Sequence, residues 1–252
     1  MSEGNNYLQY KLRGFNNLNL QENKEYPINN ELIESLKISD DLTLLHVYLK
    51  DNILYDKHSN KIETYLNHIC FNLIVHSEAS ISQPVRWLEF DSSNRMMNDA
   101  IRIRDSFTFF RNISAENVYN KIVNSPTALE KHYLKYERIF KTLHNPNQIV
   151  QFMSLYQFLM ELLSSGKEKV EQKNVTQYLR RNKKKYPFIG FELTRRKGHN
   201  FKEDSFTLLR NEIGHSEETN DLNLYESLGE KIDQSIIKKL ILVLNDVIIK
   251  LP

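Results

Sequence analysis

The second half of the chain has the spacing of apolar residues that is typical of amphipathic helices. Apolar side chains recur at steps of three and four over residues 129–143, and again over residues 149–163. Thr127 and Glu130 have the spacing of a capping box, and Pro146 suits the first turn of a second helix. The pattern predicts two helices joined by a short link, with Gly166 as the C-cap of the second.

Three more helices are expected before the end of the chain, over residues 169–182, 204–214 and 230–250. The last of them has apolar residues around most of its circumference, so it should be buried on most sides. Because the first two helices are joined by a short link, they should be antiparallel neighbours. We therefore expect an up-and-down helical bundle over residues 126–252.

The first 125 residues have a mixed pattern. Residues 7–15 alternate between apolar and polar side chains, as a half-buried strand does. Three apolar segments are candidate strands, although short runs of this kind also fit buried helix: residues 42–50, 68–76 and 84–90. Three segments have helical spacing: residues 30–37, 94–110 and 114–123. The chain is thus expected to be mainly α, with an α+β region over residues 1–125 and a helical domain over residues 126–252.

The scarcity of glycine removes one class of function. The chain has seven glycines and none between Gly14 and Gly166, so no glycine-rich phosphate loop can be built in that stretch. The single cysteine, Cys70, lies in an apolar run and is expected to be a small buried side chain. A chain with one cysteine forms no internal disulfide, which fits a reducing compartment.

Nothing in the sequence resembles a transmembrane helix or a signal peptide, so a soluble cytoplasmic protein is expected. A metal or other cofactor is not expected either. No H-E-x-x-H or C-x-x-C motif occurs, and no G-x-S-x-G motif marks a serine hydrolase. Four histidines sit among apolar or aromatic residues and are interpreted as structural: His46, His68, His76 and His132.

The formal net charge is +2, and the basic excess falls in residues 126–252. Much of it lies in residues 180–197, which are predicted to bind RNA through Arg180, Arg181, Lys183, Lys184, Lys185, Arg195, Arg196 and Lys197. Aromatic residues are interleaved with these cations and can stack on unpaired bases. The segment belongs to a connection of about 20 residues, which is long for packed helices and itself favours a function. The alternative is a solvated helix end and loop.

The most distinctive stretch is "LLRNEIGHS", residues 208–216. Arg210, Asn211 and His215 fit the pattern R-N-x-x-x-H. Asn211 and His215 are four residues apart and share a helix face, whereas Arg210 and His215 are about 140° apart on an ideal helix. They converge only if the chain bends at Gly214 or if two copies of the helix meet. The structural alternative is a helix ending at Gly214, with a histidine placed favourably at the negative end of its dipole.

This motif, on a short helix within a predicted C-terminal bundle, resembles the HEPN (Higher Eukaryotes and Prokaryotes Nucleotide-binding) superfamily. The resemblance covers residues 127–252 and leaves the N-terminal region unassigned, as a possible sensor or partner-binding part. It implies a metal-independent endoribonuclease that acts as a homodimer, with Arg210, Asn211 and His215 as catalytic residues. It also implies a prokaryotic toxin or anti-phage defence protein, with an antitoxin or another defence protein as a partner.

These residue types suit RNA cleavage. RNA supplies its own nucleophile, the 2′-hydroxyl, and a histidine that titrates near neutral pH can take or return that proton. A guanidinium can bind the scissile phosphate and stabilise the charge that develops on it. The expected products are a 2′,3′-cyclic phosphate and a 5′-hydroxyl. Two other interpretations remain: a non-catalytic HEPN module that binds RNA, a nucleotide or a protein, and a structural helical protein with a coincidental motif.

Overall fold

The structure is a computed structural model. It describes residues 7–11, 18–22, 24–39, 44–76, 85–90, 111–164, 170–196, 199–219, 227–229 and 231–252. The chain divides into two compact units, Met1–Lys131 and His132–Pro252. The boundary predicted from the sequence, after residue 125, falls close to this division.

The first unit is built on a five-stranded antiparallel sheet with the strand order β3-β4-β5-β1-β6. The strands are β1 (Tyr7–Lys11), β3 (Tyr26–Pro27), β4 (Ile33–Ile38), β5 (Leu44–Leu49) and β6 (Val85–Phe90). A separate parallel pair joins β2 (Leu18–Gln21) to β7 (Arg111–Ser114). The predicted strands over residues 7–15, 42–50 and 84–90 therefore correspond to β1, β5 and β6.

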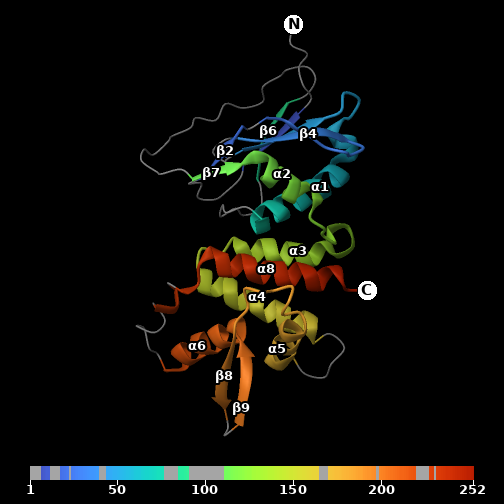
Figure 1. The fold of residues 1–252 in the computed structure, drawn as a ribbon. Helices are drawn as coiled ribbons and strands as arrows, with labels where there is room; N and C mark the ends of the chain where they lie inside the picture. The colour runs from blue at the N-terminus through green and yellow to red at the C-terminus, as the bar shows by residue number, and fades with distance from the viewer. Residues whose placement is uncertain are drawn as a thin grey trace. The chain divides into compact units, whose positions relative to one another are not determined.

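Two helices, α1 (Tyr55–His76) and α2 (Ala115–Asn124), cover one face of this sheet (Figure 1). Alternate residues of β4, β5 and β1 point to that face and are buried: Leu8, Tyr10, Leu36, Ile38, Leu45, Val47 and Leu49. The Tyr119 hydroxyl of α2 accepts a hydrogen bond from the Ile38 backbone N–H over 2.6 Å. Cys70 is fully buried within α1, and burial raises the pKa of its thiol.

One prediction in this unit is wrong. Residues 33–37 of the predicted helix 30–37 lie in strand β4, although the Asn30 side chain accepts from the N–H groups of Leu32 and Ile33 as a helix cap would. Pairing with β5 decides the conformation there. Residues 68–76, for which the sequence left both strand and buried helix open, belong to the helix α1. Residues 69–75 are all buried, so no polar face remained to show the helical period. The predicted helix 114–123 is α2, and residues 94–110 lie outside the described residues.

The second unit contains five described helices of ten or more residues. They are α3 (Leu129–Leu143), α4 (Gln148–Leu163), α5 (Gln172–Arg181), α6 (Ser205–Thr219) and α8 (Gln234–Ile249), of which the first begins in the preceding unit. In the bundle of Figure 1, α8 packs against α4 and is joined to α3 by a 2.7 Å hydrogen bond from the Tyr136 hydroxyl to the Asn245 side-chain oxygen. Of the eight residues from Leu240 to Val247, five are aliphatic and buried. This agrees with the prediction that the last helix is buried on most sides.

The predicted helix ends differ in detail. The first helix begins at Leu129, and the Thr127 hydroxyl lies 2.9 Å from Nδ1 of His68 instead of capping the helix. The second is capped by Asn147, whose side chain accepts from two backbone N–H groups, so Pro146 precedes the helix and does not occupy its first turn. This helix ends with Ser164 as its C-cap, and the predicted cap Gly166 lies outside the described residues.

The long connection between α5 and α6 is not an irregular loop. After a series of turns it forms a β-hairpin of β8 (Phe191–Arg196) and β9 (His199–Asp204), which extends from the bundle in Figure 1. Within the part of the chain that the structure describes, the protein is mostly helical with a small antiparallel sheet in its N-terminal unit. No helix among these residues is long and apolar enough to cross a membrane.

Candidate functional site

The R-N-x-x-x-H motif lies on α6, which continues through Gly214 as far as Thr219. The expectation that the helix ends near Gly214 is therefore wrong, and the chain does not bend there. Arg210 and Asn211 are half-buried, and His215 is exposed. The three predicted catalytic residues thus share one helix, with the histidine accessible to a large substrate.

The side chain of Arg210 runs along α6 towards the C-terminal part of the motif. Its Nη1 atom would lie 3.6 Å from a Cβ atom built on Gly214, the residue directly before His215. The same Nη1 atom donates to the side-chain oxygen of Asn211 over 3.5 Å, the outer limit of a hydrogen bond. The guanidinium therefore lies beside Asn211 and Gly214, while positions 210 and 215 of the unbent helix remain about 140° apart.

A carboxylate from the hairpin also contacts the motif. Glu203, at the end of β9, is 6% exposed, and its Oε2 accepts from the Asn211 side-chain nitrogen over 3.5 Å. Asn211 is therefore placed between the Glu203 carboxylate and the Arg210 guanidinium. Both contacts are at the outer limit of a hydrogen bond, and they link Asn211 to Arg210 and to Glu203.

Beneath the motif, a fully buried carboxylate fixes the start of α6. Asp204 Oδ1 accepts from the backbone N–H of Thr207 over 3.0 Å, which is the contact of a helix N-cap. Its Oδ2 accepts from the hydroxyls of Thr207 and Thr176, each over 2.6 Å. Since Thr207 gives its only hydroxyl proton to Asp204, the Tyr156 hydroxyl must be the donor in its 2.7 Å contact with Thr207.

We call this buried group the Asp204 cluster (Tyr156, Thr176, Asp204 and Thr207). It joins α6, the helix that carries the motif, to α4, α5 and β9. Burial raises the pKa of Tyr156, and the charges of Asp204 and Glu203 act in the same direction while that of Arg210 opposes them. The cluster and the motif are therefore close enough to interact electrostatically. Sequence reasoning missed it, because only Asp204 could be recognised, as a residue of capping type at a helix start.

The predicted RNA-binding residues separate into two groups. Arg180 donates to the backbone oxygen of Lys202 over 2.7 Å, and Lys185 pairs with Asp246 of α8 over 2.6 Å, so both side chains also hold the fold together. The ammonium of Lys183 lies 5.9 Å from the centre of the Phe191 ring. Arg181 and Lys184 are exposed at the end of α5 and in the turn that follows.

The remaining basic residues belong to the hairpin. Arg195 and Arg196 lie on β8, opposite Asn200 and His199 of β9, and Lys197 lies outside the described residues. Of the interleaved aromatic residues, Tyr186 is only 2% exposed and donates to Asp246 over 2.8 Å. Stacking of an RNA base on Tyr186 is therefore excluded, whereas Tyr178, Phe188 and Phe191 are half-buried.

Comparison of the chain with models of protein families, with curated proteins and with solved structures finds no match. Among the described residues, no three His, Cys, Asp or Glu side chains are grouped closely enough to hold a metal ion.

Gly214 offers a test of the geometry that needs no substrate. An added Cβ would meet only Arg210 Nη1, at 3.6 Å, which is an ordinary van der Waals distance. Because alanine is favoured over glycine inside a helix, Gly214→Ala should raise the free energy of unfolding by about 0.5–1 kcal/mol. Urea denaturation of the two proteins would measure this. A lower stability for the variant would show that Gly214 does not lie within a regular helix.

Proposed function

We propose that this protein is a metal-independent endoribonuclease of HEPN type, with its active site on α6. The observation that supports the proposal is the position of the Arg210 guanidinium beside Gly214, the residue directly before the exposed His215. In the proposal Arg210 binds the phosphate and His215 transfers the proton. The structural alternative of a helix that ends at Gly214 is not supported, because α6 continues as far as Thr219.

In the proposed reaction the 2′-hydroxyl oxygen attacks the adjacent phosphorus, and the bond from phosphorus to the 5′-oxygen breaks. His215 takes the 2′-hydroxyl proton or supplies the proton that the leaving 5′-oxygen needs. The Arg210 guanidinium binds the phosphate oxygens as their charge increases. Asn211, held by Glu203, keeps the guanidinium in place. The products are a 2′,3′-cyclic phosphate and a 5′-hydroxyl.

The decisive experiment is incubation of the purified full chain with total RNA in the presence of EDTA. Cleavage is expected to proceed, with products that carry cyclic phosphate ends. RNA binding without cleavage would favour a non-catalytic HEPN module instead. If the protein neither binds nor cleaves RNA, the motif has no function in RNA metabolism.

The exposed cations at the end of α5 and in the turn after it should contribute affinity for RNA. Replacing Arg181 and Lys184 together with alanine should weaken RNA binding and reduce its dependence on salt concentration, because fewer counterions are released. Each lost phosphate contact should lower the slope of log K against log salt by about 0.7 for single-stranded RNA.

The binding experiment requires two comparisons. Lys173→Ala changes an exposed lysine at the other end of α5 and should leave the slope unchanged. Lys185→Ala breaks the ion pair with Asp246, so this variant should also lose stability. Its RNA affinity must therefore be measured under conditions where it remains folded. A slope unaltered by the change at Arg181 and Lys184 would remove this surface from the RNA interface.

The proposal includes a homodimer, which would bring two copies of the motif together, and a role as a prokaryotic toxin or anti-phage defence protein with an antitoxin or similar partner. Sedimentation that shows a fully active monomer would contradict the dimer. Expression in bacteria should slow growth, and growth that is unaffected by an active enzyme would contradict the toxin role.

A further inference from the structure

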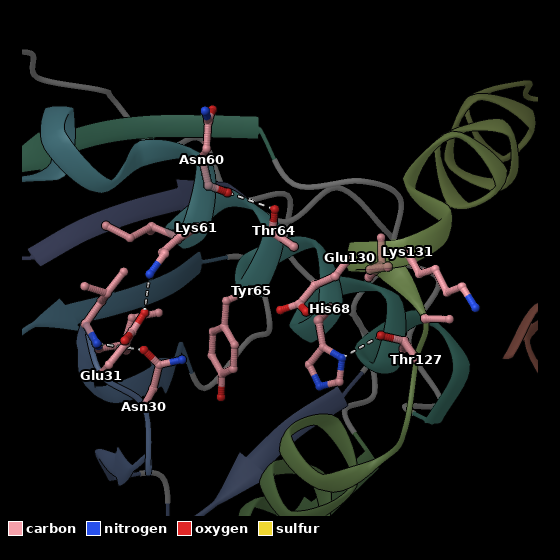
Figure 2. A pocket seen from close by; sticks show the side chains of 15 residues that line it. Asn30, Glu31, Asn60, Lys61, Thr64, Tyr65, His68, Thr127, Glu130 and Lys131 are labelled. Carbon is pink, nitrogen blue, oxygen red and sulfur yellow. Dashed lines mark hydrogen bonds and ion pairs between the residues drawn. The ribbon is translucent and has the colours of Figure 1, made fainter.

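The first unit contains a cavity of about 950 Å³, and this is not part of the α6 site (Figure 2). It is formed by the segment before β4, by one face of α1 and by residues 127–131. Its volume lies at the upper end of the range that is typical of small-molecule sites, about 300–1,000 Å³. Four buried aliphatic residues supply an apolar lining: Leu32, Ile33, Ile62 and Leu129.

Several polar groups of the cavity are already engaged within the protein. Asn30 uses its side-chain oxygen for two backbone N–H groups, and Glu31 pairs with Lys61 over 2.8 Å at the exposed rim. His68 is close to the Thr127 hydroxyl at 2.9 Å and to the Val123 backbone oxygen at 3.3 Å. Burial lowers the pKa of His68, so the imidazole is a neutral wall of the cavity.

Two groups keep their hydrogen-bonding capacity. In the described part of the chain, neither the Tyr65 hydroxyl nor the Glu130 carboxylate has a hydrogen-bond or ion-pair partner. Figure 2 shows the Glu130 carboxylate turned back towards His68 and Tyr65, while Lys131 points away from them. Burial raises the pKa of Tyr65 to about 12, so its hydroxyl keeps its proton at neutral pH.

The four charged residues of the lining are all exposed, so they stand at the rim of the cavity: Glu31, Lys61, Glu130 and Lys131. Lys61 pairs with Glu31, and Lys131 points away from Glu130, which leaves Glu130 as the negative group that faces the Tyr65 ring. A ligand with a cationic head and an apolar stem matches this group and the apolar lining. The head pairs with Glu130 and lies near the Tyr65 ring, where cations are favoured, and the stem covers the aliphatic residues.

We propose that this cavity binds a guanidinium or ammonium group carried on an apolar stem, with Glu130 as its anionic partner and Tyr65 as its aromatic wall. The same chemistry is supplied by a small basic metabolite or by an arginine side chain of a partner protein. The proposal is independent of ribonuclease activity and assigns a ligand class to the N-terminal region.

Isothermal titration calorimetry on the full chain, with N-butylguanidine as the probe, tests this assignment. We expect saturable binding to the wild type and a roughly tenfold lower affinity for Glu130→Gln, because a charged hydrogen bond is replaced by a neutral one. Glu116→Gln removes an exposed carboxylate of α2 outside the cavity and should bind like the wild type. N-butylurea, which has the same stem and a neutral planar head, should bind more weakly than N-butylguanidine.

A second variant keeps the test valid if Glu130→Gln folds poorly. Tyr65→Phe retains the ring and removes only the hydroxyl, so a roughly two- to tenfold loss of affinity is expected. An end-blocked Ala-Arg-Ala peptide separates the two sources: tighter binding than N-butylguanidine points to a protein side chain, and weaker binding to a small metabolite. Absence of N-butylguanidine binding at 10 mM, or equal affinity of the wild type and both variants, would overturn the proposal.

Discussion

Replacing His215 with alanine should abolish RNA cleavage and leave the fold intact. Loss of a group that transfers a proton in the transition state typically costs about 10²–10⁴-fold in rate. The side chain is exposed, so its removal creates no cavity in the core and the melting temperature should change little. Single-turnover cleavage of a labelled RNA in EDTA, together with thermal unfolding of both proteins, measures the two effects separately.

Arg210 offers a matched test of the phosphate-binding role. Arg210→Ala should reduce cleavage by a factor comparable to that of His215→Ala, since the lost contact acts on developing charge. Arg210→Lys keeps the positive charge but not the planar pair of donors, so it should restore only part of the rate. Glu212→Gln, an exposed residue of the same helix that pairs with Lys231, serves as the control and should remain active.

The outcomes distinguish the catalytic assignment from its structural alternative. If His215→Ala cleaves RNA as fast as the wild type, another residue must carry the proton. If the variant instead unfolds, the histidine holds the structure together and the motif has no demonstrated chemistry. Intact RNA binding with loss of cleavage would support the roles given to Arg210 and His215.

The helices of the second unit could be predicted because each leaves one apolar stripe in the sequence. The steps of three and four from Leu129 to Leu143, and from Ile149 to Leu163, correspond to α3 and α4. The same rule could not decide between strand and helix for residues 68–76, where a helix buried on nearly every side has no polar face to reveal its period. It failed for residues 30–37, where pairing with β5 overrides local spacing.

The candidate site could be predicted only as far as its residues lie close together in the sequence. Arg210, Asn211 and His215 form a short motif, but the path of Arg210 over Gly214 depends on a side-chain conformation that spacing does not fix. The Asp204 cluster combines residues from positions 156 to 207, and nothing local connects Thr176 with Asp204. The hairpin was missed because its strands carry many charged residues and lack a regular alternation of apolar side chains.

Replacing Asp204 with alanine should destabilise the second unit more than any other single change in the site. The substitution removes the N-cap of α6, which alone is worth about 1 kcal/mol. It also leaves the buried hydroxyls of Thr176 and Thr207 without their acceptor, at a cost of about 1–3 kcal/mol for each unsatisfied group. A total loss of about 3 kcal/mol or more is therefore expected in urea denaturation.

Asp233 supplies the matched control for this prediction. It caps α8 through one hydrogen bond to the backbone N–H of Ile236 over 2.9 Å, and it is exposed. Asp233→Ala should therefore cost only the ~1 kcal/mol of a helix cap. Because the Asp204 cluster fixes the start of the helix that carries Arg210 and His215, the Asp204 variant should also cleave RNA more slowly under conditions where it remains folded. Equal losses of stability for the two variants would show that the buried hydroxyls find other partners and that Asp204 is an ordinary cap.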